Sequence, residues 1–306
     1  MSARAKLLVV LGVALAYGGY RAACPRWSDA VEYSNALGDG DLLVVGDFQR
    51  TSIVEQWLMR REQNDDARAQ VIREMSRELE VGGLVLLGDL VFDGSSCSDW
   101  ESFDALFAPL ASRGVVLALG NHDYWGPDAI ACANLEPRFP WVAEHTWGVS
   151  AWGEVSIVWL DSNGELETQA TWLETTLAAI EGPVIVATHH PPYTNSTVTG
   201  DETAVQDAFV SRLTPNVRLF LSGHAHAYEH FEKEGVHYVV SGGGGGPRVD
   251  LLRGDDARHT DLFDAPAPRP FHWLRIRQHR NALEVIVRGF QKDRAVYELD
   301  RFRLAL

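Results

Sequence analysis

Leu42-Leu43-Val44-Val45-Gly46-Asp47 and Leu84-Val85-Leu86-Leu87-Gly88-Asp89 carry one pattern twice: a short apolar run, a glycine and an aspartate. Runs of this length predict strands that are buried on both faces. Three more runs end in other polar residues: Val115 to Leu119 before Gly120-Asn121-His122-Asp123, Val184 to Ala187 before Thr188-His189-His190, and Val217 to Leu221 before Ser222-Gly223-His224-Ala225-His226. Ligands of open α/β sheets bind beyond the carboxyl ends of the strands, so these polar residues predict one site.

Stretches of helical composition separate the apolar runs, at residues 53–79, 101–110, 171–180 and 204–213. This alternation of strand and helix predicts a layered α/β fold. The C-terminal part differs, because the strands predicted at 236–240, 272–277 and 283–288 have no long helix between them. No interdomain linker is evident, so residues 41–306 are predicted to form one domain.

The formal net charge of the 306-residue chain is −15. A stable nucleic-acid partner is not expected, because phosphate contacts need clustered Lys and Arg. A small phosphate substrate remains compatible with this charge, since bound divalent cations reverse the local sign of a site.

The N-terminus carries the pattern of an export signal. Arg4 and Lys6 precede an apolar run from Leu7 to Ala16, and Ala14-Leu15-Ala16 offers a cleavage site. The run is shorter than the about 20 residues of a transmembrane helix. We therefore predict a signal peptide over residues 1–16, a tether over 17–40, and export to the periplasm, the medium or a membrane anchor. An uncleaved anchor or a buried first strand is the alternative.

The three cysteines leave two questions open. Cys24 follows the signal-like segment and is a candidate for lipidation, although Arg21 stands where a lipoprotein signal normally has Leu. Contact with a membrane is expected only through such a lipid or an N-terminal anchor. Cys97 and Cys132 form an even pair, either bridged in an oxidising compartment or left as two reduced thiols.

The polar residues after the strands suit metal ions. Carboxylates bridge hard cations, and imidazole suits Fe, Zn or Mn. Two ions about 3.5–4 Å apart can clamp a phosphate ester and lower the pKa of a bound water. The sequence therefore predicts a dinuclear centre of Fe, Mn, Zn or Mg held by one set of ligands: Asp47, Asp89, Asn121, His189, His224 and His226.

Together the five motifs resemble those of the calcineurin-like metallophosphoesterase superfamily, and especially its purple acid phosphatase-like branch, over about residues 41–246. Pro191-Pro192-Tyr193-Thr194-Asn195-Ser196 and Tyr228-Glu229 extend the resemblance. It implies a four-layer αββα sandwich with a dimetal site at the strand ends. It also implies that the C-terminal strands belong to the second sheet.

The resemblance also implies a role for each residue. Asp89 would bridge the metals, with Asp47 and His226 on the first metal and Asn121, His189 and His224 on the second. His122 would stabilise the phosphate or protonate the leaving group, with Asp123 orienting its ring. Spacing alone does not decide which of His189 and His190 is the ligand; the local pattern favours His189, which leaves His190, with Asn121 and His122, as a substrate contact.

Two positions depart from the family pattern. Gln49 stands where many members have His, and Phe92 stands where purple acid phosphatases have the Tyr that gives them their colour. A Gln amide oxygen can bind a hard metal, so Gln49 is the predicted fourth ligand of the first metal, with Asp93 as the alternative. We expect no tyrosinate-to-iron charge-transfer band.

The predicted activity is hydrolysis of small phosphate esters, chiefly monoesters, by attack of a metal-bound hydroxide on phosphorus. A phosphodiesterase could use the same site. A protein of another class, a binding or scaffold protein with metal affinity weakened at Gln49 and Phe92, is the second alternative. Trp125 is a candidate to flank the substrate, and His230 to line the pocket.

Overall fold

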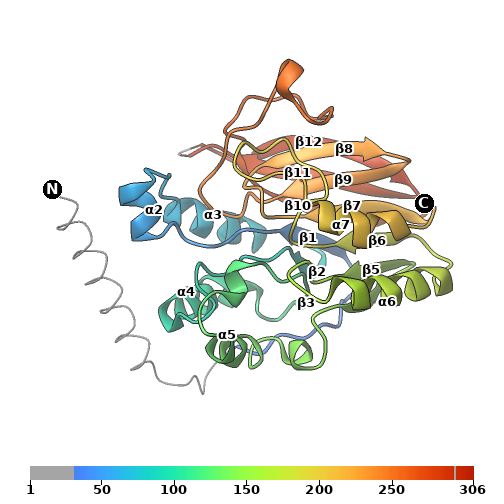
Figure 1. Ribbon diagram of the computed structural model, residues 1–306, viewed down its shortest axis with the longest axis horizontal. Helices are drawn as coiled ribbons and strands as arrows, with labels where there is room; N and C mark the ends of the chain where they lie inside the picture. Colours follow the sequence, from blue (N-terminus) through green and yellow to red (C-terminus); the bar gives the residue numbers. More distant parts are fainter. Residues whose placement is uncertain (1–30, 293) are drawn as a thin grey trace.

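The computed structural model describes residues 31–292 and 294–306, which form two packed six-stranded sheets (Figure 1). The first sheet has the order β12-β11-β10-β1-β2-β3 and the second β4-β5-β6-β7-β9-β8. Strand bounds in the first sheet are β1 Asp41–Val45, β2 Val81–Leu86, β3 Gly114–Leu117, β10 Phe271–His279, β11 Ala282–Phe290 and β12 Tyr297–Ala305. Those in the second are β4 Gly148–Trp152, β5 Val155–Trp159, β6 Val184–Ala187, β7 Val217–Ser222, β8 Tyr228–Lys233 and β9 Val236–Ser241.

Helices cover the outer face of each sheet. Their bounds are α2 Ile53–Leu58, α3 Asp65–Met75, α4 Cys97–Phe107, α5 Asp128–Leu135, α6 Leu166–Ala179 and α7 Thr203–Ala208. In Figure 1, α3, α4 and α5 accompany the first sheet, whereas α6 and α7 lie beside the second. This order of layers confirms the predicted αββα sandwich.

The apolar cores explain why the strands are continuous hydrophobic runs. Alternate side chains of a strand point to opposite faces of its sheet. In β1, Leu42 and Val44 belong to the core between the sheets, and Leu43 and Val45 to the core beneath the helices. Both faces of β1 are therefore buried, as predicted. A third core lies between the second sheet and α6.

The placement of the C-terminal strands differs from the expectation. Of those predicted, β9 joins the second sheet, but β10 and β11 extend the first sheet, together with β12. These C-terminal strands join the first sheet through the antiparallel pairing of β10 with β1, in which Leu42 lies opposite Ile276. This pairing covers an edge of β1 that would otherwise expose unpaired backbone groups.

The helix predicted over residues 53–79 is also wrong, because the segment forms two separate helices. Arg60 takes a left-handed φ of 55°, which a continuing α-helix does not allow. The residues between α2 and α3 are fixed by polar contacts instead. The Thr51 hydroxyl donates to the carbonyl oxygen of Glu62 at 2.6 Å, and the Glu62 carboxylate pairs with Arg248 at 2.8 Å.

The predicted signal peptide, Cys24 and much of the tether lie outside the described residues. The described end of the tether packs against the body of the protein. Tyr33 is buried and donates its backbone N–H to the Arg138 carbonyl at 2.7 Å. Among the residues that the structure describes, no helix is long and apolar enough to span a bilayer.

Both interpretations of the Cys97–Cys132 pair are wrong. Cys97 is disulfide-bonded, whereas Cys132 is a free thiol. The two cysteines therefore do not bridge each other, and they are not both reduced.

Candidate metal centre

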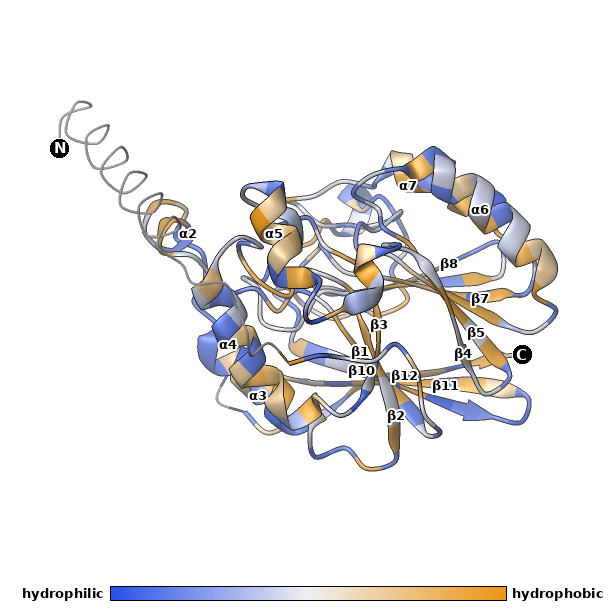
Figure 2. Cartoon of the chain, turned by 90° about the horizontal axis from the view of Figure 1, so that it is seen from below, coloured by the Kyte–Doolittle hydropathy of each residue, from blue (hydrophilic) through white to orange (hydrophobic). Residues whose placement is uncertain are grey.

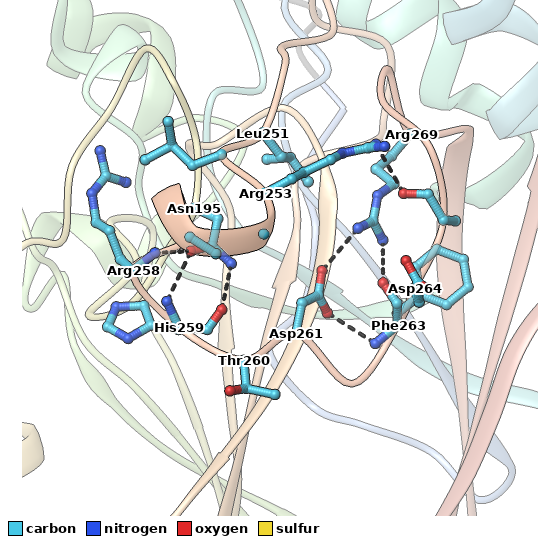
Figure 3. A pocket seen from close by; sticks show the side chains of 14 residues that line it. Asn195, Leu251, Arg253, Arg258, His259, Thr260, Asp261, Phe263, Asp264 and Arg269 are labelled. Atoms are coloured by element: carbon cyan, nitrogen blue, oxygen red, sulfur yellow. Dashed lines mark hydrogen bonds and ion pairs between the residues drawn. The ribbon is translucent and has the colours of Figure 1, made fainter.

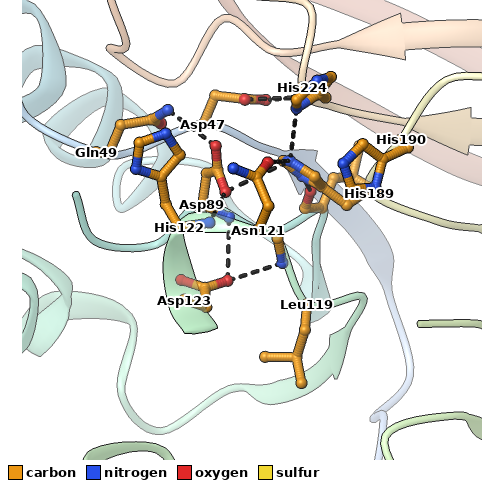
Figure 4. Close-up of polar contacts among 12 residues, drawn as sticks. Asp47, Gln49, Asp89, Leu119, Asn121, His122, Asp123, His189, His190 and His224 are labelled. Carbon is orange, nitrogen blue, oxygen red and sulfur yellow. Dashed lines mark hydrogen bonds and ion pairs between the residues drawn. The ribbon is translucent and has the colours of Figure 1, made fainter. Parts of the chain in front are cut away.

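Strand direction gathers the predicted ligands at one edge of the sandwich (Figure 4). β1, β2 and β3 run parallel, so the residues that follow them emerge together. β6 and β7 are parallel in the second sheet and deliver His189, His224 and His226. The site therefore lies between the sheets, with carboxylates and an amide from one and imidazoles from the other.

The backbone is unusual at three ligand positions. Asp47, Asp89 and His224 have φ values of 62°, 52° and 65°, a region that L-residues rarely occupy. Among the four glycines that precede ligands, Gly88 alone shares this conformation. Gly120 is required for space instead, because a Cβ there would lie 2.2 Å from a carboxylate oxygen of Asp89.

One half of the site is a cage around His189. The Nδ1 atom of His189 lies 2.7 Å from the carbonyl oxygen of Leu87, which can only accept, so Nδ1 carries the proton. Its Nε2 lone pair then faces Asn121 Oδ1 at 3.2 Å, His224 Nδ1 at 3.1 Å and Asp89 Oδ1 at 3.4 Å. Burial lowers the pKa of His189 to about 3, so the ring is a neutral ligand at physiological pH.

The other half contains Asp47, Gln49 and His226. The Nδ1 atom of His226 donates to the Pro247 carbonyl at 2.9 Å, which turns Nε2 toward Asp47 Oδ1 at 3.3 Å. The Gln49 amide lies 2.9 Å from Asp89 Oδ2 and 3.0 Å from His226 Nε2. Its Oε1 atom is buried without a hydrogen-bond partner.

This donor set fits two cations. Acceptor atoms from six predicted ligands converge, and burial raises the pKa of Asp89 because it leaves a carboxylate without water. Rotating the Gln49 amide by 180° would exchange its oxygen and nitrogen, and the oxygen would then face Asp89 and His226. The two orientations of an amide differ only in the hydrogen bonds that they make. Asp93 instead accepts from the backbone N–H and the hydroxyl of Ser95, as in a capped turn.

The consecutive residues His122 and Asp123 sit beside the cage, but the His122 ring is oriented by a group other than the Asp123 carboxylate that the resemblance implies. The Nδ1 atom of His122 lies 2.7 Å from the carbonyl oxygen of Phe92, which therefore orients the ring. The Asp123 carboxylate accepts the backbone N–H groups of Asp89, Leu90 and Gly120 at 2.9–3.1 Å. Asp123 thus fixes the backbone of two ligand loops.

His190 lies at the rim of the cage. Its Nδ1 atom is 2.8 Å from the Ser162 hydroxyl, and it forms a group of potential metal ligands with His189 and His224. The fully buried His189 faces Asn121 and Asp89, whereas His190 is partly exposed. This geometry favours His189 as the ligand and leaves His190 able to meet a substrate.

Two further residues proposed from the sequence, Trp125 and His230, have different surroundings. The Trp125 ring lies 3.9 Å from the His122 ring, centroid to centroid, and is 45% exposed, so it borders the site. His230 lies instead against His237, at 2.8 Å between ring nitrogens, and stacks on Phe302. Ser162, which holds His190, was not anticipated, because a lone Ser after a strand carries no signal.

A buried cage of carboxylate, amide and imidazole groups, placed at the strand ends of two packed sheets, defines a metal-dependent phosphoesterase fold. The chain belongs to the calcineurin-like phosphoesterase family, whose model matches residues 41–228. It is similar to purple acid phosphatase 22 of Arabidopsis thaliana, with 29% identity over 168 residues. That match covers 49% of this chain and 39% of the relative, so the chain spans about two fifths of that protein.

Solved structures share the fold at low sequence identity. GAP50 of Plasmodium, described as the anchor in the inner membrane complex, has a TM-score of 0.59 and 14% identity, with 86% of this chain and 89% of that chain covered. A dimetal phosphatase from Danio rerio has a TM-score of 0.57 and 16% identity, with 90% and 99% covered. These likenesses establish the architecture alone.

Proposed function

We propose that the protein is a metal-dependent hydrolase of small phosphate esters, chiefly monoesters. The observation that carries this proposal is one cluster of potential ligand atoms. Asn121, His224 and Asp89 lie 3.1–3.4 Å from His189 Nε2, His226 lies 3.3 Å from Asp47, and Asp47, Asp89 and His189 lie within 4.8 Å of one another. Two ions of Fe, Mn, Zn or Mg would be held there, with Gln49 as the additional ligand of the first. When bound, such ions activate water and neutralise charge on a phosphoryl group.

The residues around the cage suit the remaining tasks. The Phe92 carbonyl fixes the Nδ1–H tautomer of His122, so the Nε2 atom is the one left for a phosphate oxygen or a leaving group. His190, held by Ser162, offers a second imidazole on another side of the cage. In Figure 4, His122 and His190 lie on opposite sides of Asn121, so a phosphate ester would lie between them.

Replacement of the bridging carboxylate tests the proposal. Asp89→Asn should lower turnover of a chromogenic phosphomonoester by about 10²–10³-fold or more, because one electrostatic contact to the reacting group is worth that much. Asp250→Asn, at an exposed position, is the matched control. Circular dichroism should show both variants folded, and wild-type turnover in Asp89→Asn would refute the site.

Two alternatives remain as outcomes of parallel measurements. A diester substrate hydrolysed faster than the monoester would make the protein a phosphodiesterase. The departures at Gln49 and Phe92 favour the other alternative, a binding or scaffold protein, and the neighbour GAP50 is described as an anchor. Elemental analysis that finds less than one metal ion per chain would support that scaffold function.

We also infer that the protein is exported and that residues 41–306 form its catalytic domain. The basic and apolar pattern of residues 1–16 supports export. The disulfide at Cys97 supports it independently, because disulfides persist in oxidising compartments. Sequencing the N-terminus of the mature protein would separate a cleaved signal from a retained anchor.

A further inference from the structure

Helix α2 turns its apolar face toward solvent, the reverse of a normal surface helix. None of its six residues is buried. Its apolar side chains are exposed instead: Ile53 by 74%, Val54 by 49%, Trp57 by 80% and Leu58 by 73%, followed by Met59 at 62%. We call these five residues the α2 patch. Surface helices normally turn such residues toward the core.

Polar contacts hold α2 in this orientation. Ser52 and Glu55 form a reciprocal capping box at the start of the helix. Glu55 also pairs with Arg61 at 3.0 Å, and the Gln56 amide donates to the Thr51 carbonyl at 2.9 Å. The polar residues of α2 therefore face the protein, and its apolar residues face outward.

The position of the α2 patch is also unusual. α2 starts four residues after Gln49 and lies at the margin of the molecule, outside the four layers (Figures 1 and 2). The segment 50–61 contains three arginines and one glutamate; Arg50 and Arg61 pair with Asp99 and Glu55, and Arg60 is exposed. An exposed Trp among aliphatic side chains, with arginines beside it, is typical of a membrane interface.

We propose that the α2 patch docks the protein onto the surface of an anionic lipid bilayer, with the mouth of the metal centre close to the membrane. A second copy of the chain fits less well. A helix of six residues is about 9 Å long, too small for the about 800 Å² that each partner of a stable dimer buries.

The N-terminal segment is a candidate for a second contact with the same bilayer. The described chain enters near α4, where the Tyr33 backbone bonds to Arg138 and Arg138 pairs with Asp104. Arg50, just before α2, pairs with Asp99 of the same helix. If residues 1–16 are retained as an anchor, the apolar run Leu7–Ala16 would supply a second contact with the same membrane. Stable attachment takes two such signals.

Vesicle binding by the full chain tests the docking surface without any use of hydrolysis, so its failure would leave the proposed activity untouched. Leu58→Ser should lower the partition coefficient onto phosphatidylcholine–phosphatidylglycerol vesicles, measured by flotation, by about tenfold, the effect of burying one leucine side chain. Leu79→Ser is the matched control, because Leu79 is 77% exposed in the turn before β2. Omission of phosphatidylglycerol should weaken binding of the wild type.

Depth of insertion gives a second readout. Lipids brominated on their acyl chains should quench the wild type more than Trp57→Phe, and the difference reports Trp57 alone. Equal quenching and equal flotation of all variants would overturn the proposal. A lipid-free dimer that Leu58→Ser dissociates would also overturn it and assign the patch to a second copy.

Discussion

Backbone strain is concentrated at three of the proposed metal ligands. Of the seven non-glycine residues with positive φ in the described chain, three are Asp47, Asp89 and His224. Such conformations cost about 1–3 kcal/mol each and persist only where the surrounding structure enforces them. Here the enforcing contacts are visible, since Asp47 accepts the His224 N–H at 3.0 Å and Asp123 accepts the Asp89 N–H at 3.1 Å.

Gln49 is expected to bind metal through its amide oxygen. Gln49→Ala should weaken metal affinity by about 10–100-fold, as loss of an oriented contact at a metal site commonly does. Titration of the metal-free protein with Mn²⁺ or Zn²⁺, followed by calorimetry, measures the change. Gln63→Ala, at an exposed position, should bind as the wild type does. Equal affinity in both variants would exclude Gln49 as a ligand.

Glu229 should make stability depend on pH. Burial raises the pKa of its carboxyl to about 7, despite hydrogen bonds from the Thr194 hydroxyl and the Asn195 N–H. The folded state therefore keeps a proton that the unfolded state loses above about pH 4.5. Stability falls as pH rises from about 4.5 to 7, by about 3 kcal/mol in total, and is level above that.

Glu229→Gln removes this slope, because the amide does not titrate in that range. Urea unfolding at pH 5 and pH 8 should show that the variant gains about 2–3 kcal/mol over the wild type at the higher pH. A constant difference between the two proteins across this range would mean that Glu229 is ionised throughout.

At the scale of residues, the sequence predicts the candidate ligand side chains better than it predicts the groups that orient them. Asp47, Asp89 and His224 follow apolar strands and are recognisable by type and place. The groups that orient the imidazoles are backbone carbonyls of Leu87, Phe92 and Pro247. Every residue has a backbone carbonyl group, so the amino-acid sequence does not indicate which carbonyl groups orient the imidazole rings.

Among the elements, segment 250–259 acts as a strap across the loop that follows His190. Its backbone bonds to Thr197 and Asn195, and the Arg258 guanidinium donates to the Thr194 carbonyl at 2.8 Å. Figure 3 shows the Asn195 side chain beside the strap, with bonds to Arg258 and His259. The strap and the residues after it line an open pocket of about 380 Å³.

Asn195→Ala should release the strap. The Asn195 carbonyl Oδ1 accepts from the N–H groups of Arg258 and His259 at 2.8 and 3.0 Å, and its amide donates to the His259 carbonyl at 2.9 Å. Lost partners of buried groups cost about 1–3 kcal/mol each. Trypsin should therefore cut after Arg253 or Arg258 faster than in the wild type.

Asn281→Ala, in the exposed turn between β10 and β11, is the control for this cleavage. It should leave the tryptic pattern unchanged. Wild-type cleavage rates in Asn195→Ala would show that the strap is held by its other contacts.

Strands that are continuous apolar runs were predicted, whereas β12 and the largely buried β5 and β8 were missed. The continuous apolar runs of β1, β2, β6 and β7 were recognised because both faces pack against a core. β12 was missed because most of its residues are exposed or partly exposed. The composition of residues 53–79 favours one helix, but the contacts of Glu62 override it in the folded chain.

The whole molecule combines a large negative charge with buried acids at the site. Burial raises the pKa values of Asp89 and Asp123, and the nearby Asp89 raises that of Asp123 further. Bound cations would relieve this repulsion. Metal at 100 times its dissociation constant should stabilise the folded state by about 2.7 kcal/mol, which raises the melting temperature by about 5 °C.

Differential scanning calorimetry with excess Mn²⁺ and with a chelator measures this shift. Asp89→Asn should show a smaller shift, whereas Asp250→Asn should match the wild type. Equal melting temperatures for the wild type in both conditions would argue against any site of useful affinity.

The ligands divide between the two sheets: residues 47–121 supply the oxygens and residues 189–226 the imidazoles. Neither half of the chain holds the complete set of proposed ligands. A fragment, or one sheet formed alone, would therefore bind metal more weakly than the intact protein. Binding of both ions would therefore require that the two sheets have already packed together. A site occupied by both ions would thus indicate that the two sheets are packed in the correct register.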